Sequence, residues 1–303
     1  MSSRKALPLI GMAIWVAVIL TAPAGARSHR HFATRVVLAD DEPEFVASCA
    51  DLHMHFDHHD AVYQSEERSI SRAEAGTLRV EAEHNGGLQV QGWDKDNYGV
   101  TLCKAAEEGS DAQSLLSQIH LNFNDGKLSV SGPSSHKHWG AYLLIRAPKN
   151  AAMDLDAVNG PLSLNHVDGN LKVYAVNGPV TAAGCTGEME LSSQNGPVTL
   201  DGNSGKFTVR SENGPLTVNL NGSGWTGAGM DAHVKNGPLT LNIPSGYTSG
   251  VVLESQGPGP FSCGAAVCSQ GRKTWDDERK RVEFGSGPTV IRVSAVNGPI
   301  NVI

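Results

Sequence analysis

The densest group of residues that could do chemistry is a histidine-rich stretch near the start of the chain, Asp51-Leu52-His53-Met54-His55-Phe56-Asp57-His58-His59-Asp60. If this stretch is a β-strand, His53 and His55 face the same side, because side chains alternate along a strand. Two imidazoles in that arrangement can hold a zinc or copper ion, and His136 and His138 could contribute. A solvated polar segment is the simpler interpretation. His53 and His55 are therefore weak candidates for a metal site, and we expect neither a resident metal nor another cofactor.

Enzymatic interpretations find little support in the sequence. Asp-x-His-x-His resembles the first-strand metal motif of amidohydrolases, but those enzymes need a (β/α)₈ barrel with further ligands at later strand ends, and this chain carries a repeat instead. No Gly-x-Ser-x-Gly elbow is present. The glycine-rich stretch 222–229 lacks the lysine of a phosphate-binding loop. We predict that the chain is not an enzyme, with metal binding or metal-dependent catalysis by the His53/His55 cluster as the alternative.

Tryptophans are a further candidate feature, because their rings can form stacking platforms for sugars. They are few and scattered, so packing is the simpler role for each. The residues concerned are Trp93, Trp139, Trp225 and Trp275.

The elements that must position all these residues follow from a repeat. From Gly160 to Gly214, glycines stand nine residues apart, and each follows a residue that tolerates a turn. Two and four residues after each glycine comes a mostly apolar pair, with mostly polar residues between, as a half-buried strand requires. Every second unit carries Asn-Gly-Pro, so the full period is eighteen residues. Each nine-residue unit therefore predicts one turn and one short strand.

This pattern predicts an all-β fold, a parallel β-solenoid of the single-stranded β-helix kind. Its coils of about 18 residues would each contain two nine-residue units and would stack about 4.8 Å apart. Three inward columns are expected: Leu162, Val180, Val198, Leu216, Leu239 and Ile300; Leu164, Ala182, Leu200, Val218, Leu241 and Val302; and, on the opposite sheet, Leu171, Met189, Phe207 and Ile291. Outward positions form a hydroxyl ladder of Ser163, Thr181, Thr199, Thr217 and Thr240.

Other repeat architectures fit less well. Calcium-binding nonapeptide rolls need an aspartate where this chain has Leu164, Val173 or Leu200. Left-handed hexapeptide helices would repeat their inner residues every six positions, which the spacing here does not do. Pectinolytic β-helices carry acidic clusters on one sheet, whereas the outward positions here are hydroxyls.

The first 26 residues read as a secretory signal peptide. A basic start is followed by an apolar run and by the small residues Ala24-Gly25-Ala26. An uncleaved anchor is the alternative. A lipoprotein is rejected, because the lipobox-like Val46-Ala47-Ser48-Cys49 lies too far beyond the apolar run.

The later regions are distinguished by how regular the repeat is. They are a polar, histidine-rich N-terminal segment at 27–75 and a solenoid at 76–303, with irregular coils at 76–150, regular coils at 150–220, insertions at 222–229 and 257–287, and terminal strands at 288–303. The irregular part is interpreted as degenerate coils of the same solenoid. Its expected elements are short strands at 77–82, 88–91, 100–104, 119–123, 128–131 and 141–147 and one turn of helix at 111–116.

Charge and cysteine content restrict the partners and the compartment. The formal net charge of −7 and the lack of an uncompensated basic run argue against nucleic acid. After the signal peptide, no segment is apolar enough to span a membrane. Five cysteines in an exported chain allow at most two disulfides. We predict a Cys263–Cys268 bond, with weaker support for Cys49–Cys103, and Cys185 as the unpaired residue.

An exported leader, irregular early strands and eighteen-residue Asn-Gly-Pro coils make residues 75–303 resemble a bacterial adhesin-like β-strand-repeat domain of unknown function. That resemblance to the adhesin-like β-solenoid family implies a protein of the periplasm, the cell envelope or the extracellular space. The family has no established catalytic residues, so none is transferred. The function predicted is a non-catalytic envelope or surface scaffold, or a binding surface for an unknown envelope or surface ligand.

Overall fold

The computed structural model describes residues 35–38, 46–56, 60–82, 86–109, 111–134, 138–275 and 279–303. The signal peptide expected at 1–26 lies outside them, as do Asp57, His58, His59 and His136. Within the described residues the only α-helix is α1 (Ala112–Ser117), and two 3₁₀ turns occur, η1 (Cys49–Asp51) and η2 (Ala266–Ser269). None of these helices has the length and apolar character needed to cross a bilayer. The prediction of an all-β chain with almost no helix is confirmed.

The strands form two large, mixed sheets that stay open. The twelve-stranded sheet has the order β22-β23-β20-β24-β18-β16-β14-β12-β10-β4-β8-β7. Its strands are β4 (Leu78–Ala82), β7 (His120–Asn124), β8 (Lys127–Ser131), β10 (Ala151–Asn159), β12 (Asp168–Asn177), β14 (Thr186–Asn195), β16 (Ser204–Asn213), β18 (Thr226–Asn236), β20 (Ser249–Ser255), β22 (Arg272–Trp275), β23 (Lys280–Phe284) and β24 (Gly287–Asn297).

The eleven-stranded sheet has the order β21-β25-β19-β17-β15-β13-β11-β5-β9-β6-β3. Its strands are β3 (Ala61–Ser71), β5 (Gly86–Gly92), β6 (Asn97–Glu107), β9 (Trp139–Ala147), β11 (Leu162–Asn165), β13 (Val180–Ala183), β15 (Val198–Gly202), β17 (Leu216–Leu220), β19 (Leu239–Asn242), β21 (Phe261–Cys263) and β25 (Ile300–Val302). A separate antiparallel pair joins β1 (Arg35–Leu38) to β2 (Leu52–His55).

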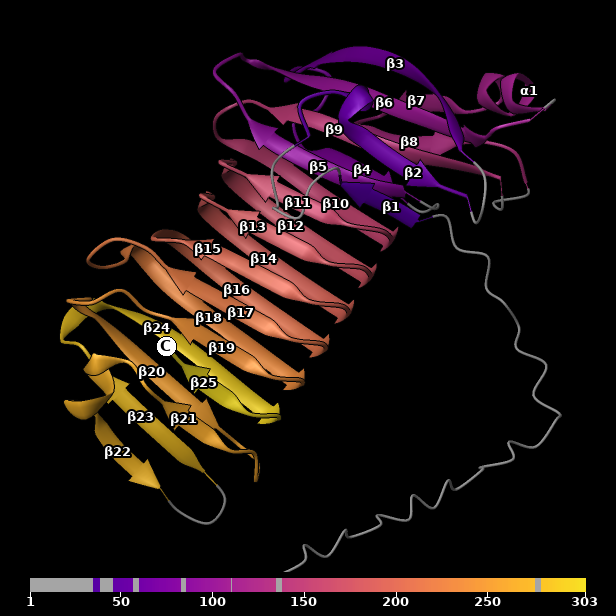
Figure 1. Ribbon diagram of the computed structural model, residues 1–303. Helices are drawn as coiled ribbons and strands as arrows, with labels where there is room; N and C mark the ends of the chain where they lie inside the picture. The colour runs from indigo at the N-terminus through magenta and orange to yellow at the C-terminus, as the bar shows by residue number, and fades with distance from the viewer. Residues whose placement is uncertain are drawn as a thin grey trace, which may run out of the picture. The chain divides into compact units, whose positions relative to one another are not determined.

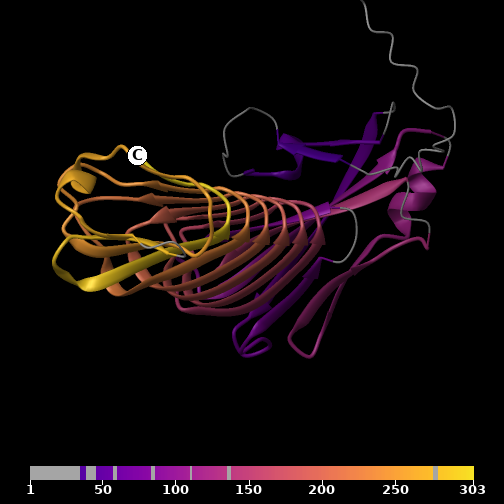
Figure 2. The same cartoon turned by 90° about the horizontal axis from the view of Figure 1, so that it is seen from below.

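The repeat sets the register in the middle of both sheets. Strands β10, β12, β14 and β16 pair in parallel with an offset of eighteen residues, and β11, β13, β15 and β17 do the same. The three inward columns are aligned as expected, with Met230 filling the gap between Phe207 and Ile291. Their side chains belong to one continuous buried cluster. Figures 1 and 2 show the two layers of stacked strands, joined at their ends by turns.

The Asn-Gly-Pro corners explain why the motif returns in every coil. Each asparagine amide donates a hydrogen bond to the amide oxygen of its equivalent in the preceding coil, as from Asn195 to Asn177 at 3.1 Å. The ladder continues through Asn159, Asn213, Asn236 and Asn297. Gly196 has φ of +133°, and a Cβ built there would lie 2.2 Å from the carbonyl oxygen of Gly178. Only glycine fits this close approach between coils.

A parallel β-solenoid along the whole chain is too specific a prediction, because both sheets are mixed. At the N-terminal end β3, β6 and β9 pair antiparallel, and so do β7 and β8. At the C-terminal end β23 pairs antiparallel with both β20 and β22. The antiparallel strands stand at the outer ends of the stack, beyond the regular eighteen-residue coils.

At both ends the order of strands in space departs from their order in the chain. Strands β4 and β5 lie between the later β8 and β9 on one side and β10 and β11 on the other. Likewise β24 and β25, which end the sequence, lie between the β18/β19 and β20/β21 coils (Figure 1). The chain reaches that place by crossing the start of β20 within two residues, Gly285 and Ser286. A Cβ at Gly285 would meet the carbonyl oxygen of Ser249 at 2.0 Å, which accounts for the glycine.

Candidate functional site

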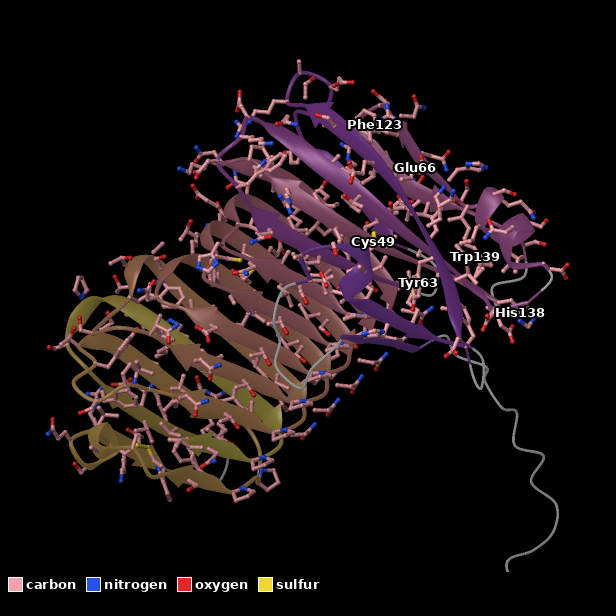
Figure 3. The ribbon with its side chains drawn as sticks, turned by 45° about the horizontal axis from the view of Figure 1, so that its top comes forward. Cys49, Tyr63, Glu66, Phe123, His138 and Trp139 are labelled. Atoms are coloured by element: carbon pink, nitrogen blue, oxygen red, sulfur yellow. A yellow bond between two sulfur atoms is a disulfide. The ribbon has the colours of Figure 1, made fainter. Side chains whose placement is uncertain are left out.

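A groove lies on the outward face of the eleven-stranded sheet, at its N-terminal end. Its volume is about 740 Å³, within the usual range for small-ligand sites. The floor comes from β3, β5, β6 and β9, one wall from residues 46–50, and the opposite rim from residues 93–97. Figure 3 shows this end of the molecule, with Cys49 and Tyr63 labelled near the wall.

Strand alternation decides which side chains reach the floor. Along β9, Leu143 and Ile145 point into the main core, so Leu144 and Arg146 point outward. Along β5, Leu88 and Val90 point inward in the same way. The outward floor residues are Ser65, Glu67, Ser69, Gln89, Gln91, Thr101, Leu144 and Arg146. The floor is therefore mainly hydroxyl, amide and charged groups rather than apolar ones.

The wall is a separate piece of chain that carries its own small core. Leu52, Met54 and Phe56 are buried against the outward faces of β6 and β9. There they meet Cys103, Ala105, Tyr142 and Leu144. Burial raises the pKa of Tyr142, whose hydroxyl has no hydrogen-bond partner within the described residues. This apolar packing holds the segment on the sheet and leaves its polar edge beside the groove.

Three local devices fix the wall in place. A disulfide joins Cys49 to Cys103 on β6. The buried Gln89 amide donates to the carbonyl oxygen of Val46 at 2.8 Å and accepts from its N–H at 3.0 Å. The Met54 N–H donates to the Tyr63 hydroxyl at 2.9 Å. The wall is thus tied to three different strands of the floor before any ligand arrives.

The opposite rim presents an indole ring. A Cβ built at Gly99 would lie 2.8 Å from the ring of Trp93, so the ring lies over the bare backbone of β6 at that point. The indole N–H of Trp93 donates to the carbonyl oxygen of Asn97 at 2.8 Å. The Asn97 amide donates to the Ser69 hydroxyl at 2.6 Å. Lys95 Nζ lies 4.8 Å from the centroid of the same ring.

The metal-site candidates are not brought together within the described residues. His53 is exposed on β2, paired with Val37 of β1, while only the backbone of His55 is described. Within the described part of the chain no group of three or more His, Cys, Asp or Glu residues has a metal-binding arrangement. His138 contacts the Glu107 carboxylate through Nδ1, and neither residue lines the groove. The metal prediction stays untested.

Both predicted disulfides, Cys263–Cys268 and Cys49–Cys103, are present. A bonded Cys49 also agrees with the rejection of the lipobox. Cys185 is free and buried, and desolvation raises the pKa of its thiol to about 11. It therefore behaves as a small apolar residue of the core rather than as a nucleophile.

Two of the four tryptophans have packing roles. Trp139 and Trp225 are buried, and their indole N–H groups donate to the carbonyl oxygens of Pro133 and Gly205. Trp275 is 56% exposed on β22, near Phe261. Only Trp93 stands beside the groove.

The sequence did not indicate the groove or β3, its edge strand. Inward positions of β3 include Glu66, whose carboxylate forms a 2.7 Å ion pair with the buried Lys104 of β6. A charged pair on the inward side hides the apolar alternation by which a strand is normally recognised. The one available signal was the Cys49–Cys103 pairing, which ties the histidine-rich segment to a predicted strand.

Comparisons with known proteins add no family assignment. No family profile matches the sequence, and no curated protein matches it. Among solved structures, a "putative cell adhesion protein" from Clostridium sporogenes is similar over 80% of this chain and 99% of its own, at 12% identity and a TM-score of 0.35. A "putative adhesin" from Bacteroides fragilis is similar over 79% of this chain and 97% of its own, at 11% identity and a TM-score of 0.32. A "putative lipid binding protein" from Parabacteroides distasonis is similar over 80% of this chain and 96% of its own, at 10% identity and a TM-score of 0.33. Similarity at this level carries no conclusion about fold or function.

Proposed function

We propose that the protein is an exported, non-catalytic binding protein whose N-terminal groove takes a polar ligand of the saccharide class. In this proposal the eighteen-residue coils form a solenoid that serves as a stiff spacer between the groove and whatever holds the C-terminal end. The observation that carries the proposal is the groove wall. It is fixed to the floor by one disulfide and two side-chain-to-backbone contacts, and preorganisation of this kind lowers the entropic cost of binding.

The groove chemistry favours a hydroxyl-rich ligand. Hydroxyls and amides line the floor, and one indole ring stands at the rim. Sugars offer alternating donors and acceptors around a ring whose C–H face stacks on aromatic side chains. A mainly apolar ligand would leave the floor's polar groups without partners, which costs free energy.

The same residues support a non-catalytic role. The described lining contains one carboxylate, Glu67, and no histidine or free thiol. Ser65, Ser69 and Thr101 therefore have no imidazole among the described lining residues to activate them, and Glu67 has no second carboxylate there with which to divide acid–base work.

The proposal is tested by measuring binding of the purified exported chain to a saccharide panel by calorimetry. We expect micromolar to millimolar binding that Trp93→Ala weakens at least tenfold. Trp275→Ala is the matched control, since it removes an exposed indole far along the sequence, and it should leave binding unchanged. Absence of binding to every saccharide, or equal effects of the two substitutions, would refute the proposal.

A further inference from the structure

The groove has a local charge opposite to that of the whole chain. The formal net charge of the protein is −7, yet the lining contains Arg68, Lys95 and Arg146 against the single carboxylate of Glu67. The Arg68 guanidinium lies 4.9 Å from the centroid of the Phe123 ring, on the inward side of the sheet (Phe123 is labelled in Figure 3). Two cations, Lys95 and Arg146, therefore remain for the groove, with one anion.

Arg146 differs from several basic residues on the outward face of the other sheet. There, cross-strand carboxylates neutralise the cations in the pairs Arg79–Asp154 (3.7 Å), Lys127–Glu81 (2.6 Å), Lys206–Glu188 (2.6 Å) and Arg210–Asp231 (3.4 Å). Arg146 is exposed and forms no ion pair with any described residue. Its register partners are Gly99 on β6 and Gln91 on β5, neither of which carries charge.

Those register partners also place Arg146 next to the indole. Gly99 has no side chain, and the space above it is taken by the Trp93 ring. Arg146 thus extends outward from the strand position next to the one that the Trp93 ring covers. Lys95 Nζ sits 4.8 Å from the same ring. A sugar ring stacked on Trp93 would take the place of Lys95 Nζ over the indole and would lie next to the strand position of Arg146.

We infer that the ligand of this groove is an acidic saccharide, whose anionic group is bound by Arg146 while Trp93 takes the ring and Gln91 and Thr101 take hydroxyls. The inference rests on the proposed function and specifies its ligand. A guanidinium presents two parallel N–H donors that match a carboxylate. A sulfate ester offers the same anionic oxygens, so the shared chemistry is a negatively charged substituent on the sugar, and a carboxylate is the better geometric match.

The experiment compares the same sugar chain with and without its charge. Oligosaccharides of galacturonic acid are titrated into the purified exported chain beside their methyl esters, which lack the charge, and beside a sulfated malto-oligosaccharide. We expect the free acid to bind at least tenfold more tightly than its ester, with affinity that falls as salt is raised. Arg146→Gln should remove this preference, and Arg146→Lys should restore part of it.

Arg292→Gln is the matched control, because Arg292 is also exposed on a strand but faces outward from the other sheet. It should change neither the affinity nor the preference. Equal binding of acid and ester, or an Arg146→Gln variant that keeps the preference, would overturn the inference while leaving saccharide binding intact. Tighter binding of the sulfated sugar than of the galacturonate would keep the anionic class and overturn the carboxylate match. No binding of any sugar would refute the proposed function itself.

Discussion

Outward polar side chains have protein partners in the repeat coils, whereas in the N-terminal region some are left without one among the described residues. In the coils several outward groups contact an identical or an oppositely charged group one strand away. The Asn195 amide bonds to Asn177 at 3.1 Å, and Lys206 pairs with Glu188 at 2.6 Å. In the N-terminal region the period is broken, and Arg146 faces glycine and glutamine.

This difference shows where a repeat protein can hold a ligand. A perfect repeat places identical neighbours side by side, so its hydrogen-bonding groups satisfy one another and rigidify the stack. A site needs groups that are held in place yet left without a protein partner. Such groups arise where the repeat stops, and here that is at the end closed by the disulfide-bonded wall.

The largest expected effect tests how far the coils depend on their neighbours. Truncation after Ser286 removes β24 and β25, which lie between the β18/β19 and β20/β21 coils. We expect amide hydrogen-exchange protection to be lost across β18–β21, because both coils then have bare edges, while β10–β14 keep most of theirs. Deleting residues 27–56 is the counterpart at the other end, and it should abolish saccharide binding while sparing protection in β12–β19. Unchanged protection in β20 after the C-terminal truncation would contradict this account.

The next effect concerns the close approach between coils. Gly196→Val places a side chain 2.2 Å from the Gly178 carbonyl oxygen in a backbone conformation with φ of +133°, so we expect a loss of about 4 kcal/mol or more in the free energy of unfolding. Gly222 also has positive φ, but the nearest atom to an added Cβ is 3.7 Å away. Gly222→Val should then cost only the conformational strain, about 1–2 kcal/mol. Denaturant titration of the two variants checks the difference, and equal losses would rule out the steric explanation.

The sequence predicted the coils well because equivalent positions in successive coils have the same surroundings. Leu162, Val180 and Val198 recur because each occupies the same environment, so periodicity alone gives their register. The Asn-Gly-Pro motif likewise predicts the turn at each corner from the local sequence alone. What periodicity could not give is the order of coils in space, since the register of β24 beside β18 depends on an offset of sixty-one residues.

The groove could not be predicted from the sequence, because its wall and floor come from segments that share no repeat and are far apart in the chain. The histidine-rich stretch attracted attention as a metal site, yet the residues that anchor it are the apolar ones between the histidines, Leu52 and Met54. Gln89 gave no sign in the sequence that it would bond to the backbone of Val46. Pairings across long separations without a repeat have no periodic signal, and only the cysteine count pointed towards one of them.

The two disulfides should separate the regions by both stability and function. Cys49–Cys103 closes a loop with a sequence separation of 54 residues and Cys263–Cys268 one of 5. Loop-closure entropy then assigns about 4 kcal/mol to the first and about 2 kcal/mol to the second. Replacing Cys49 and Cys103 by alanine should also weaken saccharide binding, because the groove wall is released. The Cys263/Cys268 double variant is the matched control, and a loss of binding in it would show that the groove is not the site.

The smallest expected effect is a pH dependence that belongs to the coils and not to the groove. His233 on β18 bonds through Nδ1 to the Ser294 hydroxyl at 2.9 Å, and desolvation, helped by the Arg210 charge, lowers the pKa of His233 from its ordinary 6.5. Below about pH 6.5 the unfolded chain therefore binds more protons than the folded one, so stability falls as the pH falls through that range. Wild-type protein should lose more of its melting temperature between pH 7.5 and pH 5.5 than His233→Gln. Saccharide affinity should stay level over the same interval, since the described lining of the groove contains no histidine. A binding curve that followed the His233 titration would show that coils and groove are coupled, and would remove the separation drawn between them.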